Sequence, residues 1–167
     1  GGRLYEANIF SIHKGNLGEP GSLSGSILYE DSTLLGKIDI NSSVGVYGSE
    51  NQLLSQLAGS DALPVAYSQE VHEGEAVIRC SVEGEVKEYE AEITRIDMNH
   101  EDTNKSFVIQ VTDPELLELT GGIVQGMSGS PVIQNGKFAG AVTHVFVQDS
   151  TSGYGIFAET MLENMTD

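Results

Sequence analysis

The dipeptide Asn135-Gly136 separates two apolar runs, residues 131–134 and 138–147. Asparagine followed by glycine is the strongest short signal for a two-residue β-hairpin, because both residues tolerate the positive φ angles of a type I′ turn. The runs on either side must then pair antiparallel. The sequence therefore predicts a β-hairpin here, and any fold of the chain has to contain it.

The middle of the chain carries the clearest alternation of charged and apolar residues. Within residues 86–96 glutamates occupy the alternate positions 88, 90 and 92, as in an antiparallel sheet with one face in water. A preceding strand, residues 75–82, joins it across the short loop Glu83-Gly84-Glu85. Further strands are predicted at residues 7–12, 26–29, 34–38 and 106–111, with a hairpin across residues 30–33 and an open choice between helix and strand at residues 52–57.

Two short helices complete the pattern. Asp113 stands where an N-cap is expected, Pro114 follows at the first helical position, and Gly121 provides the stop. Residues 158–165 fit a C-terminal amphipathic helix, with Met161, Leu162 and Met165 predicted to face inward. Many short strands with two small helices indicate a mostly β protein, an antiparallel β-barrel or sandwich.

Composition narrows the class of protein. The chain has 167 residues, the length of one ordinary domain, with 8 basic against 25 acidic residues and a net charge of −17. No useful basic patch can be assembled, which argues against a nucleic-acid partner. The single cysteine, Cys80, excludes an internal disulfide and a cysteine-based metal cluster, and its strand-like surroundings favour a structural thiol. We expect no cofactor and no metal site.

The stretch GMSGSP, residues 126–131, is the candidate for chemistry. Glycines allow a tight turn and a close approach of a substrate carbonyl to Ser128. The same turn can direct the N–H groups of Gly126 and Ser128 at one point, which forms an oxyanion hole. The order G-x-S-G-x-P resembles the nucleophile loop of chymotrypsin-like serine proteases and differs from the G-x-S-x-G elbow of α/β-hydrolases. Taken alone, the hexapeptide also fits an ordinary turn between strands.

A closer resemblance covers nearly the whole chain. The run GGIVQGMSGSPVIQNGKFAGAVTHVFVQDSTSGYGIFAETML is similar to the stage IV sporulation protein B (SpoIVB) family of serine peptidases, as are KGNLGEPG, INSSVGVYG, ALPVAYSQEV and VTDPELLELTGG. The resemblance implies a chymotrypsin-like antiparallel β-barrel, here a partial double barrel. It also implies a serine endopeptidase of endospore formation, exported from the forespore to the space between the two membranes. There such a peptidase cleaves itself and a membrane-associated regulatory protein, which frees an intramembrane protease that matures a mother-cell sigma factor.

The resemblance assigns roles to individual residues. The nucleophile falls on Ser128 and the acid of the triad on Asp113, with Gly126 and Ser128 as oxyanion donors. Thr143, His144 and Val145 fall on the strand that lines the substrate cleft. From the residues alone, Asp113 is a helix N-cap, and a capping carboxylate retains a lone pair that could serve a second role.

The chain departs from the family pattern in one respect. The family's catalytic histidine lies in a Gly-His segment upstream of the region that matches Gly1, and no residue here matches it. We therefore expect residues 1–167 to be one peptidase domain that is truncated at its N-terminal side, without the family's PDZ domain and membrane-proximal segment, and inactive alone. His13, His72 and His100 are predicted to be surface residues, and His144 a pocket or structural residue rather than the base.

Two alternatives remain open. A non-catalytic β-domain could bind a peptide along a sheet edge, with the serine loop only a turn. An esterase-type hydrolase is disfavoured because the G-x-S-x-G signature is missing. The expected partner is a protein substrate, and unpaired strand edges predict a homodimer formed by edge pairing or strand exchange. No run of the chain is apolar enough to span a bilayer, so a soluble fragment is expected.

Overall fold

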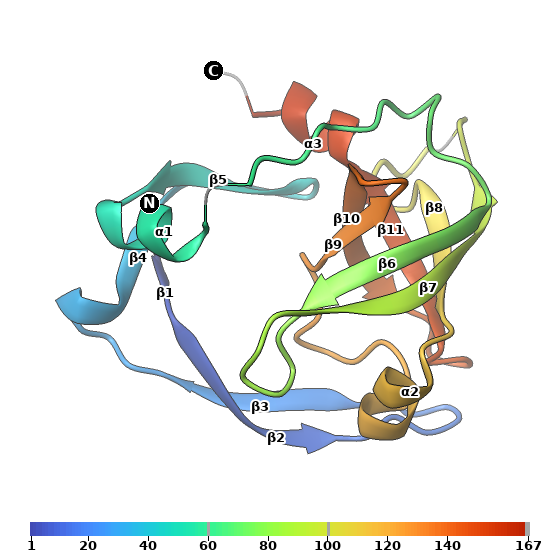
Figure 1. Ribbon diagram of the computed structural model, residues 1–167, viewed down its shortest axis with the longest axis horizontal. Helices are drawn as coiled ribbons and strands as arrows, with labels where there is room; N and C mark the ends of the chain where they lie inside the picture. The colour runs from blue at the N-terminus through green and yellow to red at the C-terminus, as the bar shows by residue number, and fades with distance from the viewer. Residues whose placement is uncertain (60, 100, 166–167) are drawn as a thin grey trace.

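The computed structural model describes residues 1–59, 61–99 and 101–165 and consists of two halves (Figure 1). The N-terminal half contains two small antiparallel sheets, β1-β4-β5 and β2-β3. Two short helical segments, a 3₁₀ turn (η1) and α1, lie at its outer end. Its elements are β1 (Gly2–Tyr5), β2 (Ala7–His13), β3 (Ser22–Ile27), η1 (Asp31–Thr33), β4 (Leu34–Ser42), β5 (Gly45–Glu50) and α1 (Gln52–Leu57).

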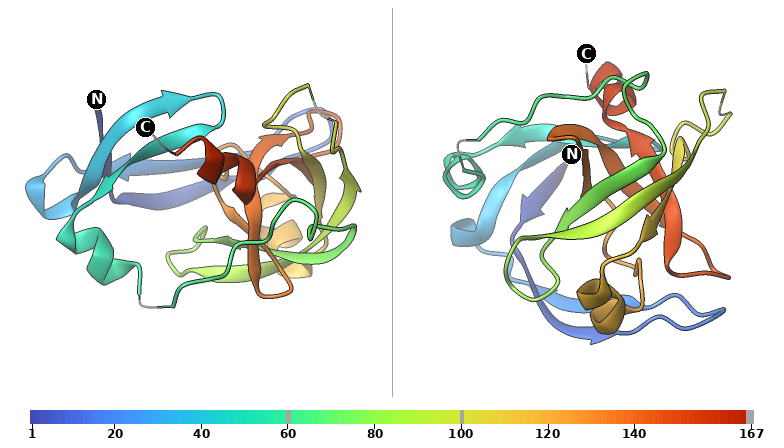
Figure 2. Two further views of the ribbon diagram at one scale, coloured as in Figure 1. Left: turned by 90° about the horizontal axis from the view of Figure 1, so that it is seen from above. Right: turned by 45° about the vertical axis from the view of Figure 1, so that its right-hand side comes forward.

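The second half is a closed six-stranded antiparallel barrel with the order β10-β11-β8-β7-β6-β9. Helix α2 precedes the serine loop, and α3 follows the last strand. The views in Figure 2 show the barrel beside the open N-terminal sheets. Its elements are β6 (Gly74–Cys80), β7 (Lys87–Ile96), β8 (Phe107–Val111), α2 (Pro114–Thr120), β9 (Pro131–Gln134), β10 (Lys137–Val145), β11 (Ser152–Phe157) and α3 (Ala158–Glu163).

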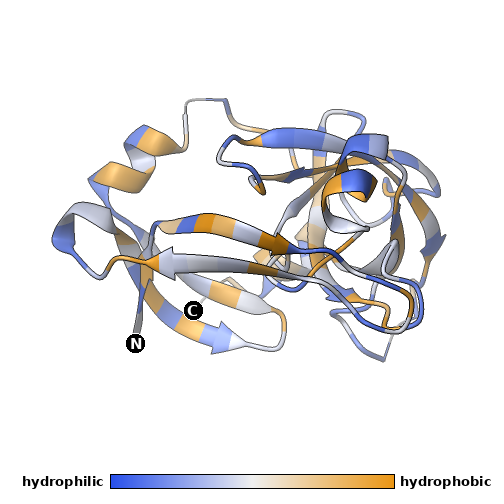
Figure 3. Ribbon diagram, turned by 90° about the horizontal axis from the view of Figure 1, so that it is seen from below, coloured by the Kyte–Doolittle hydropathy of each residue, from blue (hydrophilic) through white to orange (hydrophobic). Residues whose placement is uncertain are grey.

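The hydrophobic core lies inside the barrel. Its buried hydrophobic side chains run from Ala66 to Ala158, and Ile78, Ile93 and Ile109 have no exposed surface. Within residues 1–59 the buried residues are glycines, whereas Phe10 and Tyr29 are 67% and 73% exposed. Apolar residues on these open strands are visible in Figure 3. The barrel therefore carries the stability of the described chain, since burial of apolar surface is the main favourable term in folding.

The predictions made from local sequence for the barrel are confirmed. Asn135 and Gly136 have φ angles of 51° and 72°, as a type I′ turn requires, and they join β9 to β10. Along β7 the alternate residues Tyr89, Ala91 and Ile93 are buried and the glutamates between them are exposed. The predicted chymotrypsin-like antiparallel barrel, with a short helix before the serine loop and a C-terminal helix, is confirmed.

Two local predictions were wrong. The strands on either side of residues 30–33 do not pair with each other, because β3 pairs with β2 and β4 pairs with β1 and β5. The side chain of Thr33 donates to the carbonyl of Leu28 at 2.6 Å, and the chain turns through η1 into another sheet. In the C-terminal helix Met161 is half-buried, but Leu162, in the last turn of the helix, is 40% exposed. Met165 is 55% exposed because the helix ends before it, at Glu163. Residues 52–57, left open in the sequence, form α1.

No helix in the described part of the chain has the length and apolar character needed to cross a membrane.

Candidate active site

Ser128 lies on the loop between α2 and β9, on the side of the barrel that faces the N-terminal half. Gly126 and Gly129 on either side of it have φ angles of 106° and 90°, which side chains rarely adopt. Ser128 is exposed, and its Oγ donates to the backbone carbonyl of Thr143 at 3.1 Å. The predicted nucleophile is therefore accessible and held against β10.

The backbone amides of the serine loop divide into two groups. Met127 N–H donates to the carbonyl of Val124 at 3.1 Å, and Gly129 N–H donates to the carbonyl of Val142 at 2.8 Å. In contrast, the N–H groups of Gly126 and Ser128 have no acceptor among the described residues. Because Gly126 and Ser128 are also exposed, these are the two donors that a bound oxyanion could use.

An open pocket of about 490 Å³ lies beside Ser128, where the two halves meet. Its walls are the tip of the β4–β5 hairpin (residues 42–46), Asn104, residues 141–144 of β10, Ile156 and Met161. The side-chain amide of Asn104 donates to the carbonyl of Ser43 at 3.3 Å and so joins the halves. No aspartate, glutamate, lysine or arginine is among the residues that line it, so the pocket suits an uncharged group.

Thr143 and His144 form a short hydrogen-bonded chain in this pocket. The hydroxyl of Thr143 donates its single proton to the carbonyl of Asn104 at 2.6 Å. Nδ1 of His144 lies 3.0 Å from the same hydroxyl oxygen, so Nδ1 carries the proton and donates. The ring of His144 packs edge-on against Tyr154. The hydroxyl of Ser128 bonds the backbone of Thr143 and not the imidazole of His144.

The edge of β10 next to Ser128 is open beyond Val142. Strand β9 pairs with β10 as far as Ala141, and the carbonyl of Thr143 faces Ser128. The carbonyl of His144 lies against Gly153 of β11 on the other side. The register of β10 with β11 shifts between Val142 and His144. From His144 onward peptide groups alternate along the strand, so the N–H and C=O of Val145 point away from β11. An extended peptide could pair with this edge next to Ser128.

Asp113 has a different environment from Ser128. It is the N-cap of α2, and its Oδ1 accepts from the N–H groups of Glu115 and Leu116 at 2.9 and 3.3 Å. Its Oδ2 accepts from the N–H of Glu90 on β7 at 3.0 Å. Asp113 does not line the pocket beside Ser128. The structure therefore brings Ser128 together with Gly126, Thr143 and His144, and it places Asp113 on the joint between α2 and β7.

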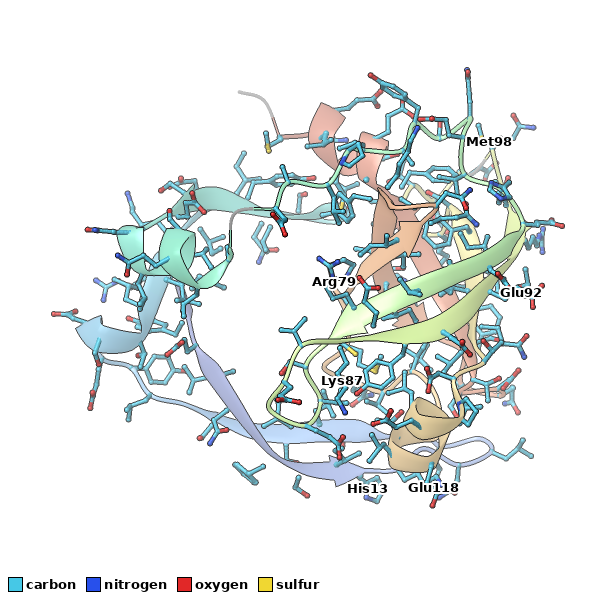
Figure 4. The ribbon with its side chains drawn as sticks, in the orientation of Figure 1. His13, Arg79, Lys87, Glu92, Met98 and Glu118 are labelled. Atoms are coloured by element: carbon cyan, nitrogen blue, oxygen red, sulfur yellow. The ribbon has the colours of Figure 1, made fainter. Side chains whose placement is uncertain are left out.

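The other histidines lie away from the serine loop. His13 on β2 and His72 are exposed, and Nδ1 of His72 is 3.1 Å from the carbonyl of Glu70. Figure 4 shows His13 at the outer edge of β2, close to Glu118 of α2. His100 lies outside the described residues. No histidine in the described ranges forms a hydrogen bond with Ser128.

Cys80, the single cysteine of the chain, is a second candidate nucleophile. It is half-buried at the end of β6, and burial raises the pKa of its thiol to about 11. Near neutral pH the thiol is therefore almost fully protonated, and a protonated thiol is a poor nucleophile. Cys80 is a structural residue, as its sequence context indicated.

Sequence reasoning missed the β4–β5 hairpin tip, Asn104 and Met161 as parts of the pocket. One signal was present, because the glycines of the run from Asn41 to Gly48 predict a bulge or a close backbone approach. The structure has such an approach: a Cβ at Gly48 would lie 1.8 Å from the carbonyl oxygen of Lys37. Nothing in that local pattern indicates that the hairpin tip reaches the serine loop.

The closed barrel and a glycine-flanked serine at the junction with a second half define the chymotrypsin-like class of folds. The chain belongs to the SpoIVB peptidase S55 family, which matches residues 1–162. No curated protein sequence is significantly similar to it.

Two solved structures share the fold, both of the Rv3671c protease from M. tuberculosis. The active form has a TM-score of 0.54 at 17% identity, with 87% of this chain and 61% of that chain covered. The inactive form has a TM-score of 0.53 at 16% identity, with 89% and 73% covered. The chain thus spans 61% of the length of the active-form protease. At this level of identity the likeness extends to the fold.

Proposed function

We propose that the chain is the peptidase domain of a serine endopeptidase in which Ser128 is the nucleophile. The observation that carries the proposal is the serine loop itself. Ser128 is exposed, and two backbone amides of its loop, those of Gly126 and Ser128, have no acceptor in the described structure. Such a pair is what an acyl-transfer site needs to stabilise the oxyanion of a tetrahedral intermediate. Membership of a peptidase family supports the same reaction.

The substrate binds as an extended strand along the open edge of β10. The backbone of Thr143 and Val145 supplies the hydrogen bonds, which is the usual way for a sheet edge to recognise a peptide. His144 contacts the bound chain through the pocket that it lines. Because no aspartate, glutamate, lysine or arginine lines that pocket, the group that enters it is uncharged.

The general base comes from a histidine outside residues 1–167, in the Gly-His segment that the family carries upstream. This is supported by the contacts of the described histidines, none of which reaches Ser128. A serine hydroxyl without a base stays protonated near neutral pH. Loss of one triad member costs on the order of 10⁴-fold in rate, so the chain alone reacts very slowly.

Family membership also supports a biological role. The whole protein acts in endospore formation after export from the forespore, and it cleaves itself and a membrane-associated regulatory protein. That cleavage frees an intramembrane protease that matures a mother-cell sigma factor. The resemblance assigns the triad acid to Asp113, whereas its contacts with the backbone amides of α2 and β7 favour a structural role, so the activity of Asp113→Asn decides between the two.

A serine-directed fluorophosphonate tests the proposal. We expect it to label Ser128 rapidly in a polypeptide that carries the Gly-His segment ahead of Gly1, and very slowly in residues 1–167. Ser128→Ala should abolish labelling and self-cleavage of the longer polypeptide. Ser55→Ala, at an exposed serine of α1, is the matched control and should change neither. Absence of labelling in the longer polypeptide would favour the peptide-binding alternative, and rapid labelling of residues 1–167 would show that the base lies within them.

A further inference from the structure

The peptide group between Gln125 and Gly126 carries one of the two proposed oxyanion donors, the N–H of Gly126. Its carbonyl, that of Gln125, accepts a hydrogen bond from the N–H of Leu23 on β3 at 2.9 Å. The N–H of Gln125 donates in turn to the carbonyl of Gly21, also at 2.9 Å. These bonds form a short parallel bridge between β3 and the serine loop. Segments about a hundred residues apart in the sequence are thus joined beside the site (Figure 2).

Peptide geometry converts this bridge into a direction for the Gly126 amide. A trans peptide is planar, so its C=O and its N–H point in opposite directions. No peptide bond in the described residues is cis. With the carbonyl of Gln125 turned toward β3, the N–H of Gly126 must point away from β3. There it meets no acceptor among the described residues, which leaves it available to a substrate oxygen.

A rotation of this peptide by half a turn would remove the donor. The N–H of Gly126 would then face β3, and the carbonyl oxygen of Gln125 would face the position of the substrate oxyanion. The φ angle of 106° shows that Gly126 already occupies a region open mainly to glycine, where such rotations meet little steric resistance. An interaction with the rest of the protein must therefore select one orientation.

We propose that β3 selects it: the backbone N–H of Leu23 holds the Gln125–Gly126 peptide in the orientation that presents the Gly126 N–H to the oxyanion. Leu23 is a positioning residue, because it acts through Gly126 and does not touch the reacting atoms. The proposal rests on the proposed function of the serine loop. It adds a dependence of the catalytic loop on the N-terminal half of the chain.

The end of the β2–β3 hairpin is itself firmly attached, as a positioning element must be. The N–H of Gly15 donates to the carbonyl of Thr120 at 2.9 Å. Gly21 is buried so tightly that a Cβ there would lie 2.2 Å from the carbonyl oxygen of His13. The side chain of Leu23 covers Gly126, with its Cβ 3.2 Å from where a Cβ of Gly126 would be.

The other flank of the same segment is held by the loop before β11. The N–H of Ile123 donates to the carbonyl of Ser150 at 2.7 Å, and the hydroxyl of Ser150 donates to the carbonyl of Gly121 at 2.9 Å. The approach to the serine loop is therefore fixed on both sides. Under these constraints the orientation of the Gln125–Gly126 peptide depends on the hydrogen bond from the N–H of Leu23.

The sharpest test removes the N–H of Leu23 and keeps its side chain. Replacement of Leu23 by its α-hydroxy analogue, leucic acid, turns the amide into an ester and keeps the side chain. The matched control is the same replacement at Leu17, which is 90% exposed and whose N–H has no acceptor in the described structure. Leu23→Ala, which keeps the N–H, separates the effect of the side chain from that of the donor.

The readout is fluorophosphonate labelling of Ser128 in the polypeptide that carries the Gly-His segment. We expect the maximal labelling rate to fall at least about fivefold, the worth of one net hydrogen bond, and at most about 10²–10³-fold, the cost of a lost oxyanion donor. The concentration for half-maximal rate should stay within about twofold, because reagent binding precedes use of the oxyanion hole. The Leu17 ester should label at the normal rate, and thermal melting should show that both esters are folded.

Two results would overturn the proposal. One is a maximal labelling rate in the Leu23 ester within about twofold of the unmodified protein. The other is the absence, in residues 1–167, of NMR scalar coupling across the hydrogen bond from the Leu23 amide nitrogen to the Gln125 carbonyl carbon. The coupling needs no catalysis. If the unmodified longer polypeptide is not labelled at all, the proposed function fails. The coupling still decides whether the Leu23 N–H holds the Gln125–Gly126 peptide.

Discussion

Substitutions at Asp113 can distinguish a structural role of its carboxylate from a catalytic one. Asp113→Ala removes the N-cap of α2, which costs about 1 kcal/mol, and the acceptor for the Glu90 N–H, which costs about 1 kcal/mol more. A loss of about 2 kcal/mol lowers the melting temperature of a domain this size by about 4–8 °C. Asparagine is as good an N-cap as aspartate, so Asp113→Asn should keep the first contribution and lose only part of the second.

Activity then distinguishes the two roles of Asp113. Its oxygens accept from backbone amides of α2 and β7, and it does not line the pocket of Ser128. We therefore expect Asp113→Asn to keep the fluorophosphonate labelling rate of the longer polypeptide within about tenfold. Asp31→Asn, at an exposed carboxylate of η1, is the matched control. A fall on the order of 10⁴-fold with unchanged melting would refute this reasoning and make Asp113 the triad acid.

Three further outcomes follow from the structure. Because the pKa of Cys80 is raised to about 11, its alkylation by iodoacetamide should be slow at pH 8 and should accelerate tenfold per pH unit until the pH nears that value; a plateau below pH 9 would contradict the burial. Gly136→Ala should cost about 1–2 kcal/mol in urea unfolding, because φ is 72° while the space around the position is open; an unchanged midpoint would contradict the turn type. The open strands of the N-terminal half predict dimers by edge pairing or strand exchange, which light scattering at rising concentration should detect; monomers throughout would count against them.

The parts of the fold that depend on neighbouring residues could be predicted from the sequence. The Asn135-Gly136 turn and the cap at Asp113 are fixed by backbone preferences and hydrogen bonds within a few residues. The hairpin predicted across residues 30–33 failed because turn-forming residues do not determine which strands pair afterwards. Strand β4 lies between β1 and β5, a choice made by long-range packing.

The same distinction applies to the candidate site. Ser128 and Gly126 stand in one continuous motif, and the proximity of Thr143 and His144 to Ser128 could be predicted because they follow it on one hairpin. The hairpin tip at residues 42–46 could not, since it reaches the pocket of Ser128 only when the two halves associate. Asn104 and Met161 belong to the barrel half, but they reach the pocket through the packing of the segment between β7 and β8 and of α3, which no local pattern predicts. The Asn104–Ser43 contact that joins them involves no sequence pattern that would predict it.

Stability and catalytic competence are carried by different parts of this chain. The barrel holds the hydrophobic core, whereas the half that contains Leu23 buries no hydrophobic side chain within residues 1–59. Segments with few buried apolar contacts open at a lower free energy than the core does. Opening of β3 would break the bridge to Gln125 and release the Gly126 peptide while the barrel stays folded. A ligand or partner that covers the N-terminal strands would therefore favour the competent orientation of the serine loop, because it binds the state in which β3 is in place.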